Sequence, residues 1–139
     1  MKYVVDASVA VKWYVPEVHS IEAERLLDPA YDLHAPDLIL LEFGNILWKK
    51  VGRGELTAAQ ARKIVEAFIG VPMFKHPASP LLEAALDGAI QSAQTVYDWT
   101  YLALAIALNC QMVTADEKFY LALRSGALAT HLCWVADIP

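Results

Sequence analysis

Cysteine is scarce in this 139-residue sequence, which contains only Cys110 and Cys133. They lie far apart and form no C-x-x-C motif, which argues against a disulfide framework and against a zinc site built from thiolates. The chain begins MKYVVD, which reads directly as a strand, so we expect no secretory signal peptide. These features predict a reduced, cytoplasmic protein.

Long hydrophobic runs are also missing, although 57% of the residues are apolar. No apolar run reaches the roughly 18 residues that a transmembrane helix requires. We therefore predict one heavily buried domain over residues 1–139, with apolar surface left for a partner and no membrane segment. We find no internal repeat, low-complexity tract or linker.

Positive charge is in short supply, because 11 Lys and Arg residues face 16 Asp and Glu residues and the formal net charge is −5. This balance argues against a broad basic surface for duplex DNA. It remains compatible with a small nuclease that contacts phosphate through a metal ion. The histidines have no ligand spacing, and we assign them no role.

The chain instead offers short apolar strands that alternate with helical segments. The predicted strands cover residues 3–5, 33–35, 73–75, 111–114 and 132–135. The predicted helices cover residues 9–14, 20–27, 38–51, 58–69, 81–93, 99–108 and 117–123. Alternation of this kind predicts an α/β fold with three α/β/α layers and a central, mainly parallel sheet with right-handed crossovers. The last strand is expected at an edge.

Four carboxylates lie at strand ends or on apolar helices in this pattern. Asp6 follows the first strand, Asp116 follows the fourth, Asp98 opens a nearly wholly apolar helix, and Glu42 lies on an apolar helical face. Each has a local explanation. Asp6 and Asp116 could cap helices, and Asp98 could be a first-turn acid stabilised by the helix dipole. Glu42 could reach solvent at the edge of its helix. A single metal site explains all of them together, because clustered carboxylates repel one another unless a cation is present. Oxygen ligands without His or Cys favour Mg²⁺ or Mn²⁺.

Four segments of the chain resemble the signature blocks of PIN-domain ribonucleases, and most of all those of VapC toxins. In chain order these segments are VVDASVAVKW, APDLILLEFGNILWKK, VYDWTYLALA and MVTAD. The likeness runs from Tyr3 to about Tyr120. It implies a PIN-like fold and Mg²⁺- or Mn²⁺-dependent hydrolysis of RNA phosphodiester bonds. It also implies that the metal-binding and catalytic residues are Asp6, Glu42, Asp98 and Asp116.

Three further residues are candidates for supporting the acids. The resemblance places small hydroxyl residues near the first acid and before the last, which are Ser8 and Thr114 here. Asn45 lies one helical turn beyond Glu42 and could orient it, or could simply be a polar residue. Trp99 departs from the small residues usual in the family, and could either pack in the core or narrow the active-site cleft.

The remaining expectations concern partners. Lys12, Lys49 and Arg53 are candidates for contacts to RNA phosphates, and Lys50 lies beside them; the alternative is ordinary cations near a helix C-terminus. The resemblance further implies a VapB-like antitoxin whose helix fills an apolar groove on the early helices, and a homodimer. These early helices carry Trp13, Tyr14, Phe43, Leu47 and Trp48, most of which we expect in the core, while any that are exposed could line the groove.

Two other functions remain open at this point. One is a PIN-like binding module without catalysis, against which the intact set of acids speaks. The other is a phosphoacceptor signalling domain, because acids at strand ends also bind Mg²⁺ there. That second function gives no purpose to a glutamate inside an apolar helix.

Overall fold

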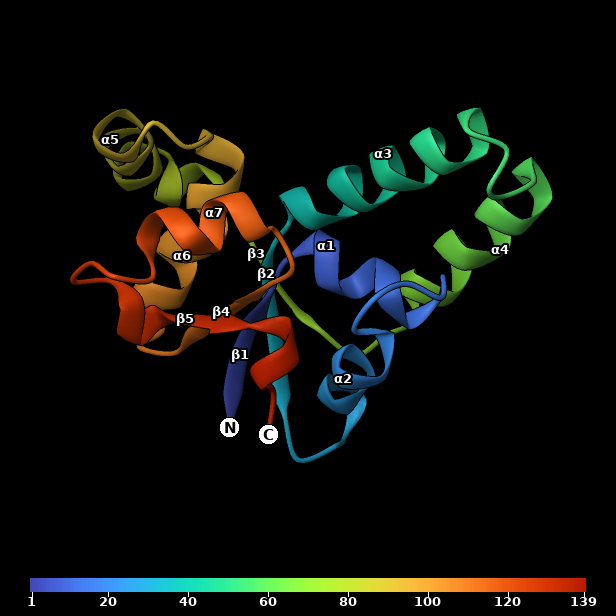
Figure 1. The fold of residues 1–139 in the computed structure, drawn as a ribbon, viewed down its shortest axis with the longest axis horizontal. Helices are drawn as coiled ribbons and strands as arrows, with labels where there is room; N and C mark the ends of the chain where they lie inside the picture. The colour runs from blue at the N-terminus through green and yellow to red at the C-terminus, as the bar shows by residue number, and fades with distance from the viewer.

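Five parallel strands form one sheet in the computed structural model, which describes residues 1–139 (Figure 1). The strands in chain order are β1 (Lys2–Val5), β2 (Asp32–Pro36), β3 (Phe74–His76), β4 (Gln111–Thr114) and β5 (Leu132–Trp134). In space they follow the order β3-β2-β1-β4-β5, so β5 is an edge strand as predicted. Val4 pairs with His34 on one side and with Met112 on the other, which places β1 at the centre.

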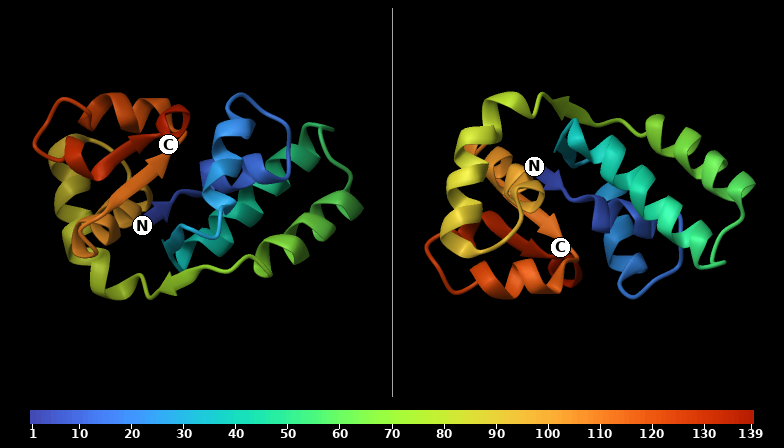
Figure 2. Two further views of the ribbon diagram at one scale, coloured as in Figure 1. Left: turned by 90° about the horizontal axis from the view of Figure 1, so that it is seen from below. Right: turned by 90° about the horizontal axis from the view of Figure 1, so that it is seen from above.

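Helices cover both faces of this sheet, which confirms the α/β/α fold. They are α1 (Ala7–Ala10), α2 (Ser20–Glu24), α3 (Leu38–Gly52), α4 (Ala58–Ile69), α5 (Leu82–Ser92), α6 (Val96–Ala107) and α7 (Glu117–Leu123). Short 3-10 helices cover Val11–Trp13, Arg25–Leu27, Ser79–Leu81, Ala129–His131 and Val135–Asp137. Figure 2 shows α1 to α4 on one side of the sheet and α5 to α7 on the other. Helices α3 and α4 form an antiparallel pair that projects beyond the sheet (Figure 1).

Helix α6 is the core element on its side of the sheet. Seven of its residues are buried, from Trp99 to Ala105 without interruption. A helix that is apolar on every side is stable only when other elements surround it. Helix α6 meets this condition, because it packs against the sheet on one side and against α5 on the other.

Trp99 packs in the core, which settles the alternative left open by the sequence. Its side chain is buried, and its indole Nε1 donates a hydrogen bond to Ser92 Oγ at 2.7 Å. Gly88 of α5 lies directly against the ring, so that a Cβ atom at this position would be only 2.3 Å from Trp99 Cε3. The glycine therefore permits the close approach of α5 to α6.

Element boundaries differ from the prediction at a few places. The first helix is split into α1 and a 3-10 turn, and the third strand lies one residue later than expected. Helix α6 begins at Val96 rather than Trp99, because the Thr95 hydroxyl accepts a hydrogen bond from the Asp98 amide and caps the helix earlier. No helix combines the length and the apolarity that crossing a membrane would require.

Two glycine substitutions test this packing. Gly88→Ala should lower the free energy of unfolding by about 1–3 kcal/mol, because the new methyl group overlaps a ring that has no room to move. Gly44→Ala, in the interior of α3 with no atom within 4 Å of the new Cβ, should raise it by about 0.5–1 kcal/mol. Urea unfolding followed by circular dichroism measures both. Equal stability of the two variants would contradict the proposed role of Gly88.

Candidate active site

All four predicted acids lie at the carboxyl end of the sheet. Asp6 directly follows β1, and Asp116 lies two residues beyond β4. Glu42 is in the second turn of α3, and Asp98 is in the first turn of α6. The N-termini of both helices lie at this edge, because helices that connect parallel strands run opposite to the strands. Ligands of open α/β sheets bind at this edge.

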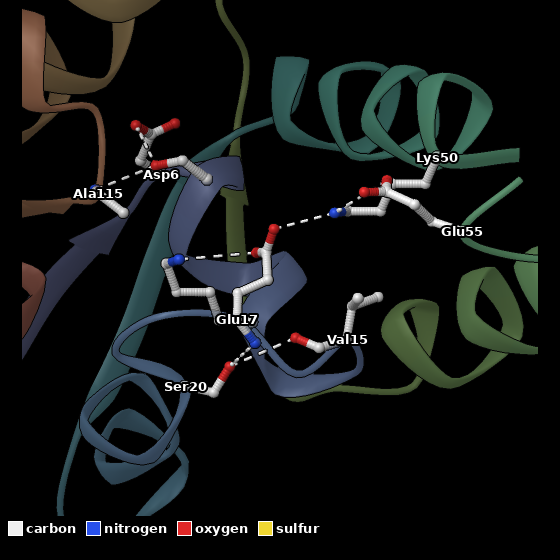
Figure 3. A network of polar contacts seen from close by, with 9 residues as sticks. Asp6, Val15, Glu17, Ser20, Lys50, Glu55 and Ala115 are labelled. Atoms are coloured by element: carbon white, nitrogen blue, oxygen red, sulfur yellow. Dashed lines mark hydrogen bonds and ion pairs between the residues drawn. The ribbon is translucent and has the colours of Figure 1, made fainter. Parts of the chain in front are cut away.

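Asp6 is the most deeply buried of these acids, with 3% of its surface exposed. It occupies the N-cap position of α1 but makes no capping hydrogen bond, which rules out the helix-capping explanation. Its Oδ2 atom instead accepts hydrogen bonds from the hydroxyls of Ser8, at 3.0 Å, and Thr114, at 2.9 Å. Ser8 Oγ also accepts a hydrogen bond from the Ala115 amide, so β1, α1 and the end of β4 meet at this carboxylate (Figure 3).

Asp116 and Asp98 are each held by local hydrogen bonds. The Asp116 amide donates to Thr114 Oγ1, and its Oδ1 accepts from the Phe119 amide at 3.1 Å and so caps α7. For this residue the capping explanation is correct, and the other carboxylate oxygen stays without a hydrogen bond to the protein. Asp98 Oδ2 accepts a hydrogen bond from the hydroxyl of Thr95 at 3.1 Å.

Glu42 points inward, with its Oε1 atom buried and without a hydrogen-bond partner. The hydroxyl of Tyr101, a fully buried residue of α6, lies beside this carboxylate but is likewise unpaired. Buried polar atoms without partners are rare and costly, and they call for an explanation. The alternative that Glu42 reaches solvent is therefore wrong for this oxygen.

Burial and mutual repulsion raise the pKa values of three of these acids, which are Asp6, Glu42 and Asp98. Burial is the main cause in every case. It raises the pKa of Asp6, with a smaller contribution from Asp116 and with opposition from the Thr114 and Ser8 hydrogen bonds. The pKa of Glu42 rises to about 7, with Asp6 and Asp98 as further causes. The pKa of Asp98 rises to about 6, with Asp6 and Asp116 as further causes. Glu42, Asp98 and Asp116 thus each lie within electrostatic range of Asp6.

This arrangement has the donor chemistry of a divalent-cation site but not its closed geometry. No set of three or more His, Cys, Asp or Glu side chains is close enough as it stands to hold a metal ion. The raised pKa values and the unpaired Glu42 oxygen nevertheless fit a cation, because a positive charge would relieve both. Carboxylate oxygens alone suit Mg²⁺ or Mn²⁺ better than zinc.

Comparison with known proteins supplies the family. A family model described as the PIN domain matches residues 3–122. The chain belongs to the PIN-domain family. Ribonuclease VapC3 from Pyrobaculum aerophilum is 38% identical over 134 residues, which cover 94% of this chain and 99% of that protein. Ribonuclease VapC9 from Mycobacterium tuberculosis is 34% identical over 115 residues, which cover 83% and 86% of the two chains. The likeness to VapC proteins seen in the sequence is thus confirmed.

Solved structures agree on the fold of this PIN domain. PAE2754 from Pyrobaculum aerophilum matches 98% of this chain and 85% of its own, with a TM-score of 0.70 and 22% identity. VapC20 from Mycobacterium tuberculosis, described as a sarcin-ricin loop cleaving toxin, matches 87% and 95%, with a TM-score of 0.67 and 17% identity. VapBC2 from Rickettsia felis, bound to a DNA fragment from its promoter, matches 96% and 98% with a TM-score of 0.64 and 15% identity.

A basic pocket lies beside the acids of the PIN domain. It has a volume of about 310 Å³, and Ser8 and Ala115 form its border with the Asp6 site. The basic residues that line it are Lys12, Lys49, Lys50 and Arg53. Three of them were candidates for RNA contacts, and the structure brings all three together. Within the pocket, Glu17 lies 2.9 Å from the buried Lys50 and 3.6 Å from Lys12 (Figure 3).

A second, apolar groove runs between α3 and α4. It has a volume of about 500 Å³, and its apolar lining includes Leu47, Trp48, Val51 and Val65. Trp48 is 69% exposed, whereas Phe43 is buried in the core. The expectation that most of these early-helix residues lie in the core therefore holds for Phe43, whose ring stacks on Phe68 with centroids 3.9 Å apart.

The supporting residues fall into two groups. Ser8 and Thr114 both bind Asp6, whereas Asn45 is exposed and makes no hydrogen bond to any of the acids. Sequence reasoning missed Tyr101 and Thr95. Thr95 could have been found from the T-x-x-D spacing of a helix cap, and Tyr101 from its position one turn after Asp98.

Stability should depend on pH in the direction set by these acids. A carboxyl with a raised pKa in the folded state binds its proton more tightly there than in the unfolded chain. Without divalent metal, the tighter proton binding by Glu42 and Asp98 therefore stabilises the folded state fully below about pH 4. This contribution to the free energy of unfolding is lost as the pH rises towards 7. Added Mg²⁺ or Mn²⁺ should restore stability at pH 7.5.

Melting temperatures at pH 5 and pH 7.5, with EDTA throughout, test this dependence. Glu42→Gln removes a carboxylate whose ionisation opposes folding, so this variant should melt a few degrees above the unsubstituted protein at pH 7.5. A gain of 1 kcal/mol corresponds to roughly 3–5 °C in a chain of this size. The exposed Glu83→Gln on α5 serves as the matched control. A melting temperature that rises from pH 5 to pH 7.5 would contradict the raised pKa values.

Proposed function

We propose that this PIN domain is a divalent-metal-dependent endoribonuclease and the toxin of a VapBC-type toxin–antitoxin pair. The observation that carries the proposal is the buried Asp6 carboxylate with the partly buried carboxylates that repel it at the carboxyl end of the sheet. Family membership and the VapC relatives support RNA as the substrate class. Mg²⁺ is the proposed ion, with Mn²⁺ as the alternative.

Each acid has a proposed part in this chemistry. Asp6, fixed by Ser8 and Thr114, would be the central ligand, and Glu42, Asp98 and Asp116 would approach it from three other elements. A divalent ion held there would supply a water of lowered pKa and offset the negative charge of the scissile phosphate. The side chains would need to shift to bind one ion together, because they form no ligand cluster as they stand.

The basic pocket is the proposed binding place for RNA phosphates. Its cations lie next to Ser8 and Ala115, so a backbone phosphate held there would place the next phosphodiester near Asp6. Lys49 and Arg53 are exposed, whereas Lys50 is buried and paired with Glu17. Lys49 and Arg53 are therefore the main proposed RNA contacts. Lys12, which also pairs with Glu17 at 3.6 Å, stays a prediction, and Lys50 is assigned to holding α3 against the α1–α2 connection.

The groove between α3 and α4 is the proposed place for a VapB-like antitoxin helix. Its exposed Trp48 and aliphatic lining match the apolar face of an amphipathic helix. The homodimer implied by the resemblance to VapC toxins stays a prediction.

The two rival functions fit these observations less well. Phosphotransfer to an aspartate needs an accessible carboxylate, and Asp6 is 3% exposed with an oxygen that accepts two hydrogen bonds. A binding module without catalysis has no use for a group of acids in which Asp6, Glu42 and Asp98 have raised pKa values. The metal-dependent nuclease accounts for both facts.

Removing one acid should abolish cleavage and leave the fold intact. We expect Asp98→Asn and Asp6→Asn each to lower the rate of RNA cleavage at least about 100-fold, because each removes a charge that the cation needs. The assay uses purified protein and a broad RNA pool with Mg²⁺ or Mn²⁺, with and without EDTA. Asp32→Asn, an exposed acid at the opposite end of the sheet, is the matched control and should cleave normally.

The outcomes of this assay separate the alternatives. Cleavage that needs metal and is lost only in the site variants supports the nuclease. Cleavage at the normal rate in Asp98→Asn, with circular dichroism unchanged, would rule out the proposed metal site.

Charge reversal in the basic pocket should weaken RNA binding. We expect the double variant Lys49→Glu and Arg53→Glu to lower RNA affinity about 10-fold or more at low salt and to reduce the salt dependence. The control Lys63→Glu and Lys75→Glu makes the same change in net charge at exposed positions outside the pocket. Equal losses in both double variants would show an effect of net charge alone, and would count against the pocket.

A further inference from the structure

The turn that carries Asp116 separates two pockets. On one side Ala115 lines the basic pocket described above. On the other side Glu117 lines a second pocket of about 350 Å³, formed by α7 and the end of β5. The two chain neighbours of Asp116 thus line two pockets of different character, and the nuclease chemistry above does not use the second.

Two aromatic rings form one wall of this second pocket. Tyr120 and Trp134 are half-buried, with ring centroids 5.4 Å apart and planes tilted by 35°. The His19 ring also contacts Trp134, with centroids 6.1 Å apart and ring planes at 80°. The pocket is completed by Leu121, Arg124 and the carboxylates of Glu117 and Asp137.

The aromatic wall lies at the carboxyl end of the sheet, as the acids do. Trp134 pairs in register with Thr114, whose hydroxyl binds Asp6. Neighbouring strands are about 4.8 Å apart, so the Trp134 backbone lies roughly 10 Å from that of Asp6, across β4. Tyr120 lies one helical turn after Asp116. A nucleotide next to the scissile bond would therefore reach this wall.

We propose that Tyr120 and Trp134 form a subsite that stacks an unpaired RNA base beside the scissile phosphodiester. This inference rests on the proposed ribonuclease function and names its substrate form as single-stranded RNA. Aromatic side chains bind any base through its flat face, and a base inside a duplex has both faces covered by its neighbours. The Arg124 guanidinium and the two carboxylates would meet the polar edge of the stacked base.

The charge of the second pocket favours a base over a phosphate. Glu117 and Asp137 would repel a phosphate, whereas base amino groups can donate hydrogen bonds to them. Four other basic side chains line the basic pocket, to which Ala115 also contributes. A single strand across the acids would thus have its backbone neutralised on one side and its base stacked on the other.

Binding of intact RNA tests the subsite without relying on cleavage. The probes are a short single-stranded RNA and its duplex, both fluorescently labelled, titrated with full-length protein in EDTA. We expect Trp134→Leu and Tyr120→Leu each to weaken single-strand binding about 5- to 100-fold. Trp134→Phe and Tyr120→Phe should retain most of the affinity, and duplex binding should not change.

Phe74→Leu removes an exposed ring from β3 at the far edge of the sheet and is the matched control. Single-strand affinities of the leucine variants within two-fold of this control would overturn the subsite. Equal losses for single strand and duplex would also overturn it. If either of these results is found while the unsubstituted protein cleaves RNA with metal, the proposed nuclease function stands and only the subsite fails. If the unsubstituted protein neither binds nor cleaves RNA, the nuclease function and the subsite both fail.

Discussion

A carboxylate with almost no exposure lies where β1 ends, and the site is assembled around it. Two hydroxyls, one from α1 and one from the end of β4, donate to the same oxygen of Asp6. Without them a buried charge of this kind would be strongly unfavourable. These bonds tie the first strand to a residue 108 positions later in the chain, so the hydrogen bonds that stabilise the charge also fix the position of the β4–α7 turn.

The acids around Asp6 cost stability, and the rest of the fold compensates. Burial and repulsion raise the pKa values of Glu42 and Asp98, so ionising them opposes folding when no cation is present. Helix α6 carries Asp98 at its exposed start and buries the next seven residues. The same helix therefore holds an unfavourable charge in place through apolar contacts elsewhere along its length.

Much of this arrangement follows from local patterns in the sequence, and the rest depends on tertiary contacts. Alternating strands and helices predict the parallel sheet, and acids after strands predict where they meet. The family was recognisable because four segments carry their motifs in order. The hydrogen bond from Thr114 to Asp6, the Glu17 pairing with Lys50 and the contact of Trp134 with Tyr120 join residues distant in the chain. No spacing or periodicity predicts such contacts.

Helix α3 links the proposed functions, because it presents a different group on each of its faces. Glu42 faces the acids, Lys49 lines the basic pocket, and Trp48 lies in the groove against α4. Lys50, near the C-terminal end of α3, forms an ion pair with Glu17, and Glu17 also pairs with Lys12 in the basic pocket. A partner helix in the groove would therefore bind the same rigid element that carries a proposed metal ligand and the proposed RNA contacts.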